Sequence, residues 1–184
     1  MTPKGRAIVT DGATTVRALP PAALIAFDLW SNPDAAVARI GEALGGRLPE
    51  IGRSTAMGDA CRALRIEPAV WWLVGPLETV HVALARLEAA LQADGAATDL
   101  SGGFTRLRLA GPDWRELLMI GGVFDAESAD FGPDSTVGTL LHHIGVRYDV
   151  VAEDEVHIHV APSYADDLLR HLRAAASRLA GPDL

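Results

Sequence analysis

The stretch "AVWWLVGPLETVHVALARLEAAL", residues 69–91, contains the joint that decides the fold. An apolar run ends at Gly75-Pro76, and leucine and valine then recur every three or four positions as far as Leu91. Apolar runs rich in aromatic and β-branched residues are typical of strands, and the later spacing is typical of one helix face. Proline suits the first turn of a helix because it lacks an N–H that would be unpaired there. The stretch therefore predicts a strand that leads into a proline-started helix.

The same joint recurs at Asn32-Pro33, Gly111-Pro112 and Ala161-Pro162. Repeated strand-to-helix joints with further strands between them predict an α+β fold of two ferredoxin-like βαββαβ halves, residues 1–100 and 101–184, with helices packed on antiparallel sheets. The predicted helices are 33–45, 76–92, 112–121 and 162–179. The predicted strands are 23–30, 59–66, 69–74, 96–100, 104–109, 136–143, 146–151 and 155–160.

The second half has no room for a closing strand after residue 180. We therefore expect the spare strand "RAIVT", residues 6–10, to fill that place in its sheet.

Composition narrows the function classes. The 184 residues contain 16 Lys and Arg against 24 Asp and Glu, a net charge of −8, which argues against nucleic acid and anionic membrane surfaces as partners. Neither a signal-peptide pattern nor a membrane-spanning run is present, so we expect a cytoplasmic protein. Cys61 is the single cysteine, and its simplest interpretation is a small apolar core residue.

The glycine-containing segments at residues 101–103 and 111–112 have the small residues of a phosphate-binding loop but not its sequence context. Ser101-Gly102-Gly103 is followed by the strand pattern "FTRLRL", whereas a dinucleotide fingerprint must lead into a helix. We interpret this segment as a hairpin turn. Gly111-Pro112 does precede a helix, but proline offers no N–H to a phosphate.

Histidines are the strongest candidates for a metal site. His157 and His159 lie on one face of a predicted strand, and His142-His143 lies on a nearby strand. Three imidazoles could hold a metal, but alternation with valine and isoleucine fits a half-exposed strand equally well.

Four carboxylates gather at Asp125, Glu127, Asp130 and Asp134, where a solvated loop is the simpler interpretation than calcium binding or carboxylate chemistry. No nucleophile elbow is present in the sequence. We therefore assign no catalytic, cofactor-binding or metal-ligating residue.

Trp71-Trp72 indicates a sheet that is apolar on both faces, because adjacent strand residues point to opposite sides. Either both indoles lie in the protein's core or one contacts a partner.

An ordered series of short motifs spans residues 96–178: a D-[LV]-S-x-G turn, T-x-L-x-L-x-G, a short helix with paired leucines, an aspartate before an F-x-P loop, and V-x-x-S-[YF]-A. This series resembles the γ subunit family of heterotetrameric sarcosine oxidase. The matching residues are Asp99, Leu100, Ser101, Gly103, Thr105, Leu107, Leu109, Gly111, Leu117, Leu118, Asp125, Phe131, Pro133, Val160, Ser163, Tyr164 and Ala165. Phe131-Gly132-Pro133 departs from the family's usual F-P-x-G loop.

The resemblance implies a fold akin to the folate-binding domains of aminomethyltransferases. It implies a non-catalytic structural subunit, with α, β and δ partners, of an enzyme that oxidatively demethylates sarcosine or a related N-methyl amine. FAD, FMN, NAD, tetrahydrofolate and zinc are then expected in the partner subunits and none in this chain, and the isolated chain is expected to self-associate. A stand-alone folate-domain-like ligand-binding module and a small metalloenzyme built on the histidine strands are the alternatives.

Overall fold

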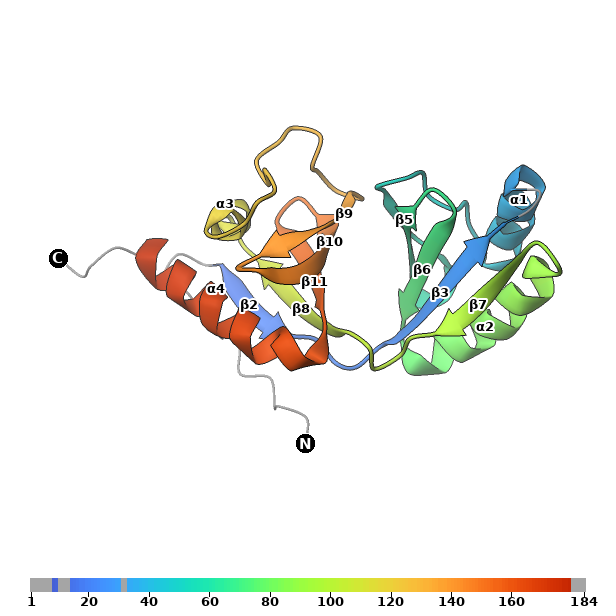
Figure 1. Ribbon diagram of the computed structural model, residues 1–184, viewed down its shortest axis with the longest axis horizontal. Coiled ribbons are helices and arrows are strands. Elements are labelled where there is room, and N and C mark those ends of the chain that lie inside the picture. Colours follow the sequence, from blue (N-terminus) through green and yellow to red (C-terminus); the bar gives the residue numbers. More distant parts are fainter. Residues whose placement is uncertain (1–7, 10–13, 31–32, 180–184) are drawn as a thin grey trace. The chain divides into compact units, whose positions relative to one another are not determined.

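The computed structural model describes residues 8–9, 14–30 and 33–179. The chain divides into two compact units (Figure 1). The continuous unit is Pro21–Gly103, and the split unit joins Met1–Pro20 to Phe104–Leu184. The structure thus differs from the predicted halves, 1–100 and 101–184, in the first 20 residues, which belong with the C-terminal part of the chain.

The continuous unit has the βαββαβ order that the sequence predicts. Its described sheet runs β4-β5-β6-β3-β7, and every pair is antiparallel. Without the short edge strand β4, this is the ferredoxin-like arrangement. The elements are β3 (Ala23–Leu29), α1 (Pro33–Ala43), β4 (Ser54–Ala56), a 3₁₀ turn (Gly58–Ala60), β5 (Arg62–Glu67), β6 (Val70–Gly75), α2 (Leu77–Leu91) and β7 (Gly95–Asp99).

The split unit repeats this layout, with its closing strand β2 and a further edge strand β1 supplied by the N-terminal segment. Its described sheet runs β1-β2-β8-β11-β10-β9, so β9-β10-β11-β8-β2 corresponds strand for strand to β4-β5-β6-β3-β7. The elements are β1 (Ile8–Val9), β2 (Thr15–Ala18), β8 (Thr105–Ala110), α3 (Trp114–Met119), β9 (Thr136–Leu141), β10 (Ile144–Ala152), β11 (Glu155–Val160), a 3₁₀ turn (Pro162–Tyr164) and α4 (Ala165–Leu179).

The closing strand of the split unit is β2, and not residues 6–10 as predicted. β2 pairs with β8, and its Val16 lies opposite Leu109. Ile8 and Val9 pair with β2 farther out in the same sheet, while residues 6, 7 and 10 lie outside the described residues. Val16 has no exposed surface and joins the core of the split unit, which explains why this strand closes the sheet.

Helices cover one face of each sheet, and the core of each unit lies between them (Figure 1). Pro33 begins α1 and Pro76 caps α2, as the joint predicts, whereas Pro112 precedes α3 by two residues and Pro162 opens the 3₁₀ turn before α4. Cys61 is buried in the core of the continuous unit. No described helix has the length and apolarity needed to cross a membrane.

Candidate functional site

The sheet of the split unit is apolar toward its helices and charged on its other face. Alternation along β8, β10 and β11 places Leu107, Tyr148 and Ile158 in the core, with their sequence neighbours on the opposite face. Strand register arranges those neighbours in two rows. They are Arg17, Arg108, His157 and Asp149 in one row, and Arg106, His159 and Arg147 in the other.

One linked group on this face joins β8 to β11. Arg108 Nη2 donates to Glu155 Oε2, and His157 Nε2 lies 3.1 Å from Glu155 Oε1. The hydrogen bond from Arg108 lowers the pKa of Glu155, and burial lowers the pKa of His157 although the carboxylates nearby oppose that shift. Glu155 is therefore ionised and accepts hydrogen bonds from Arg108 and His157. The bond from Arg108 stabilises the pairing of β8 with β11.

His159 and Asp149 lie deeper on the same face. They are only 1% and 2% exposed. Burial lowers the pKa of His159 to about 3, so its imidazole is neutral at physiological pH. A histidine in this state cannot act as a general acid near neutrality.

His157 and His159 do not gather with His142-His143 into the metal site that the sequence left open as a candidate. His142 and His143 form the turn between β9 and β10, and the ring beside them is that of His171 on α4. In the described part of the chain, no group of three or more His, Cys, Asp and Glu side chains is arranged to hold a metal ion. Sequence reasoning missed His171 because nothing in its local pattern on α4 points toward the turn.

The four loop carboxylates, Asp125, Glu127, Asp130 and Asp134, are all exposed, which agrees with the interpretation as a solvated loop. Asp125 Oδ1 accepts a hydrogen bond from the backbone N–H of Glu127 at 3.0 Å, which closes a local turn.

Arg115 and an aromatic cluster anchor this loop to α3. Arg115 Nη1 donates to the carbonyls of Ala126 and Phe131 at 2.6 Å each. The ring of Phe131 packs against those of Trp114, Phe124 and Tyr148.

Ser101-Gly102-Gly103 is a turn, but it does not close a hairpin. The strands it joins, β7 and β8, lie in different sheets, so the hairpin interpretation is wrong. The Ser101 N–H donates to Asp99 Oδ1 at 2.8 Å, and hydrogen bonds from Ser101 lower the pKa of Asp99. Gly102 takes a φ of 82°, and its turn leads into a strand, where no helix N-terminus could meet a phosphate.

The side chains of the two adjacent tryptophans lie on opposite faces of the continuous unit's sheet. Trp71 is 1% exposed and stacks on Phe27, with ring centroids 5.6 Å apart. Trp72 is 8% exposed and lies opposite Leu64 on the other face. The exposed tryptophan is Trp30, at 63%, which sequence reasoning did not single out.

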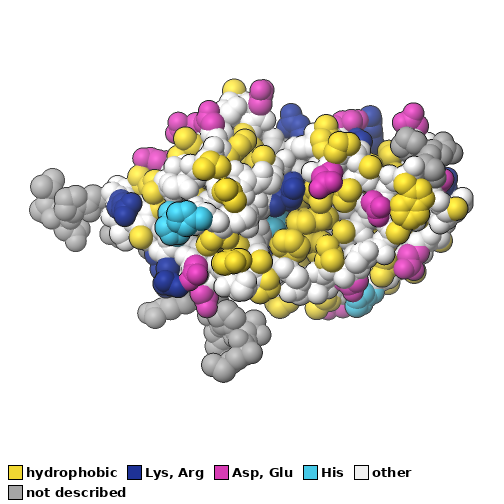
Figure 2. All heavy atoms as spheres, viewed as in Figure 1, with side chains coloured by type: hydrophobic (Ala, Val, Ile, Leu, Met, Phe, Trp, Pro, Cys, Tyr) yellow, Lys and Arg dark blue, Asp and Glu magenta, His cyan; other side chains and the backbone are white. Residues whose placement is uncertain are grey.

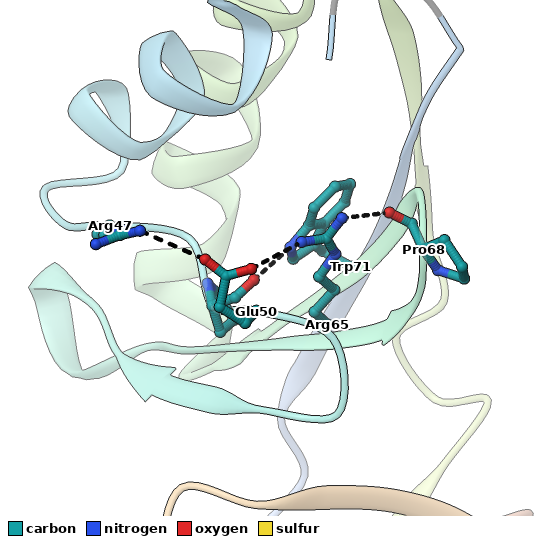
Figure 3. Close-up of polar contacts among 6 residues, drawn as sticks. Arg47, Glu50, Arg65, Pro68 and Trp71 are labelled. Carbon is teal, nitrogen blue, oxygen red and sulfur yellow. Dashed lines mark hydrogen bonds and ion pairs between the residues drawn. The ribbon is translucent and has the colours of Figure 1, made fainter. Parts of the chain in front are cut away.

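Arg65 extends the aromatic row across the strands (Figure 3). Its guanidinium carbon lies 4.6 Å from the centroid of Trp71, and its Nη2 donates to the Pro68 carbonyl at 2.5 Å. Glu50 lies between two arginines, 3.6 Å from Arg65 Nη1 and 3.4 Å from Arg47 Nη2 (Figure 3). This cluster covers the buried indole at the β5–β6 turn.

Basic side chains stand singly on the face of the molecule in Figure 2, separated by hydrophobic and acidic ones. Three arginines form ion pairs with carboxylates, as Arg108–Glu155, Arg65–Glu50 and Arg39–Asp94. These contacts make the ionic groups part of the scaffold.

Comparison with solved structures gives the fold's relatives. A chain of heterotetrameric sarcosine oxidase from Corynebacterium sp. U-96, in complex with pyrrole 2-carboxylate, superposes with a TM-score of 0.83 at 22% identity, covering 97% of this chain and 91% of that one. The glycine cleavage system aminomethyltransferase T from Bartonella henselae gives a TM-score of 0.65 at 18% identity, covering 84% of this chain and 44% of that one. The regulatory subunit of aspartate kinase from Thermus thermophilus gives 0.50 at 13% identity, covering 87% and 96%.

Comparison with curated protein sequences gives no match. A family description does match: that of the sarcosine oxidase γ subunit, over residues 30–178. The matched range begins directly after β3 and covers the rest of the continuous unit. It continues through the C-terminal part of the split unit and ends one residue before the end of α4. The chain belongs to the sarcosine oxidase γ subunit family.

Proposed function

We propose that this chain is a non-catalytic structural subunit of a cytoplasmic, heterotetrameric sarcosine oxidase-type flavoenzyme. The family match over residues 30–178 carries the proposal. The shared fold with a chain of a heterotetrameric sarcosine oxidase, over 97% of this chain, supports it. In this proposal the partners are the α, β and δ chains, and the substrate is sarcosine or a related N-methyl amine.

The contacts of the ionisable side chains support a structural role. Glu155 is held between Arg108 and His157, and His159 is buried and neutral. Catalytic acids and bases instead need a pKa near the working pH and access to a substrate proton. In this proposal FAD, FMN, NAD, tetrahydrofolate and zinc are bound by the partner chains.

Affinity purification of a tagged copy from the native host tests the assembly. We expect the chain to be recovered with three partners in a yellow, flavin-containing complex that oxidises sarcosine. Recovery of the chain alone, under conditions where the host uses sarcosine, would contradict the proposal.

Two variants test the non-catalytic assignment within the assembled complex. We expect Glu155→Gln and His157→Gln to change the yield of complex while leaving kcat per flavin within about twofold, because neither side chain takes part in the reaction. A large loss of kcat in a fully assembled complex would refute the assignment.

The similarity in fold to an aminomethyltransferase favours a second candidate, a stand-alone ligand-binding module of the folate-domain type. A saturable rise in Tm of the isolated chain with tetrahydrofolate would support this module. An unchanged Tm would count against it.

A further inference from the structure

The loop between α3 and β9, residues 120–135, is held by two side chains from one face of α3. Arg115 and Met119 stand four positions apart in this helix, so their side chains lie on the same face. Both contact Ala126, which has no exposed surface. Arg115 Nη1 donates to the Ala126 carbonyl at 2.6 Å, and the Ala126 N–H donates to Met119 Sδ at 3.2 Å. Both backbone polar groups of this buried residue therefore have their partners on α3.

Met119 combines this contact with exposure to solvent. It is 39% exposed, whereas Met57, the other methionine that the structure describes, is 8% exposed and packs in the core of the continuous unit. A thioether sulfur is a weak hydrogen-bond acceptor. It is also a nucleophile that oxidants convert to a sulfoxide, and exposed sulfurs react first. One sulfur atom therefore holds the loop and is open to chemical modification.

We propose that Met119 is a site of reversible oxidation by hydrogen peroxide, and that this modification loosens the attachment of Ala126 to α3. A lone pair on Sδ attacks an oxygen atom of the peroxide, so an S–O bond forms as the O–O bond breaks. The sulfur is oxidised and the peroxide is reduced. The departing hydroxide takes up the remaining proton and leaves as water. A polar, chiral sulfoxide then replaces the flexible apolar thioether.

The hydrogen bond from Ala126 determines which lone pair of the sulfur reacts. A thioether sulfur has two lone pairs, and the Ala126 N–H lies against one of them. Attack through the other lone pair gives mainly one of the two sulfoxide epimers, whereas a methionine without such a contact gives both. Each epimer is reduced by its own class of methionine sulfoxide reductase. The contact seen in the structure therefore predicts which modification products form.

Oxidation weakens one of the two bonds that hold Ala126. The new oxygen lies on the side of the sulfur away from the Ala126 N–H, and it withdraws electron density from the remaining lone pair. A buried N–H whose acceptor is weakened costs free energy. Arg115 still binds the carbonyls of Ala126 and Phe131, so the loop remains attached farther along. We therefore expect a local loosening of the split unit and not its unfolding.

The proposed function supplies a source of the oxidant. A flavin-containing oxidase that passes electrons to dioxygen forms hydrogen peroxide, which would arise in the same complex as this chain. The source of the peroxide rests on the proposed function, but the reactivity of Met119 does not.

Treatment of the full chain with dilute hydrogen peroxide, followed by trypsin digestion and mass spectrometry, tests the site. Cleavage after Arg115 and Arg147 places Met119 in a peptide of its own, residues 116–147, apart from Met57. We expect oxygen to be added at Met119 at least about tenfold faster than at Met57. Complete oxidation of Met119 should lower Tm by about 2–4 °C. One class of sulfoxide reductase should remove most of the added oxygen and restore Tm, while the other class removes little.

Met119→Leu and Met57→Leu are the matched variants, because leucine has a similar volume and no sulfur. Peroxide should leave the Tm of Met119→Leu unchanged, whatever its starting value, and should lower that of Met57→Leu as in the unsubstituted chain. Hydrogen exchange of the unsubstituted chain gives a second measurement. Amides of residues 126–131 should exchange faster after oxidation, while those of β3 keep their rates.

Three results would overturn the proposal. They are equal rates of oxidation at Met119 and Met57, equal amounts of the two epimers at Met119, and an unchanged Tm after Met119 is fully oxidised. All three are measured on the isolated chain with added peroxide. They are therefore separate from the question of whether the chain assembles with partners.

Discussion

Val16 provides a direct test of the split unit. Its side chain has no exposed surface and packs with core residues contributed almost entirely by the C-terminal part of the chain. Val16→Ala removes about two methylene equivalents at about 0.8 kcal/mol each, and the residual cavity adds up to about 1 kcal/mol. The expected loss in the free energy of unfolding is therefore about 1.5–2.5 kcal/mol, or about 4–8 °C in Tm.

Hydrogen exchange locates this loss within the chain. We expect amides of β8, which pairs with β2, to exchange about 10- to 60-fold faster in Val16→Ala, while amides of β3 in the continuous unit keep their rates. Arg17→Ala is the control, because Arg17 is exposed on the opposite face, and it should change stability by less than about 0.5 kcal/mol. Unchanged exchange in β8, or equal acceleration in β3, would refute the assignment of β2 to this sheet.

Three further predictions concern packing, pH and the arginine–tryptophan contact. Gly75→Ala should destabilise the chain by about 1–3 kcal/mol in urea unfolding, because its Cβ would lie 2.7 Å from a cysteine Sγ, whereas Gly145→Ala meets nothing within 4 Å and should be neutral. Burial lowers the pKa of His159 from 6.5 to about 3, so as the pH falls the unfolded chain binds a proton at this histidine before the folded chain does. The free energy of unfolding should therefore decrease as the pH drops below 6.5. His159→Gln should make this decrease smaller. An unchanged pH slope would contradict this. Arg65→Ala should lower the free energy of unfolding by about 1–2 kcal/mol, because it loses the contacts with Trp71 and with the Pro68 carbonyl. Arg47 has a side chain that is 89% exposed, so Arg47→Ala should lower it by less than about 0.5 kcal/mol. Equal losses in the two variants would show that the indole contact contributes little.

Local signals in the sequence predicted most of the fold. The apolar run of β6, the proline after it and the helical spacing of α2 lie within one short stretch, and the structure forms them as β6 (Val70–Gly75) and α2 (Leu77–Leu91). Strand β2 was missed because it is four residues long, contributes one core side chain, and pairs with a strand about 90 residues away. Such a pairing depends on tertiary packing and leaves no local pattern.

The candidate site was less predictable for the same physical reason. Alternation correctly placed His157 and His159 on one face of a strand, but it could not say which elements lie beside that strand. His142 and His171 meet through the packing of a turn against a helix, and neither segment alone indicates the other. The sequence likewise did not determine where Trp71 and Trp72 lie. In the structure, Trp71 lies in the core of the continuous unit, and Trp72 lies on the opposite face of the sheet.

Deleting the gene for this chain in its host, and then purifying the sarcosine-oxidising flavoprotein, tests the central proposal most directly. We predict that the partner chains fail to assemble into a stable flavin complex without it, and that a restored copy recovers assembly and kcat together. A sarcosine-oxidising complex of undiminished yield and specific activity, purified from the deletion strain, would contradict the account.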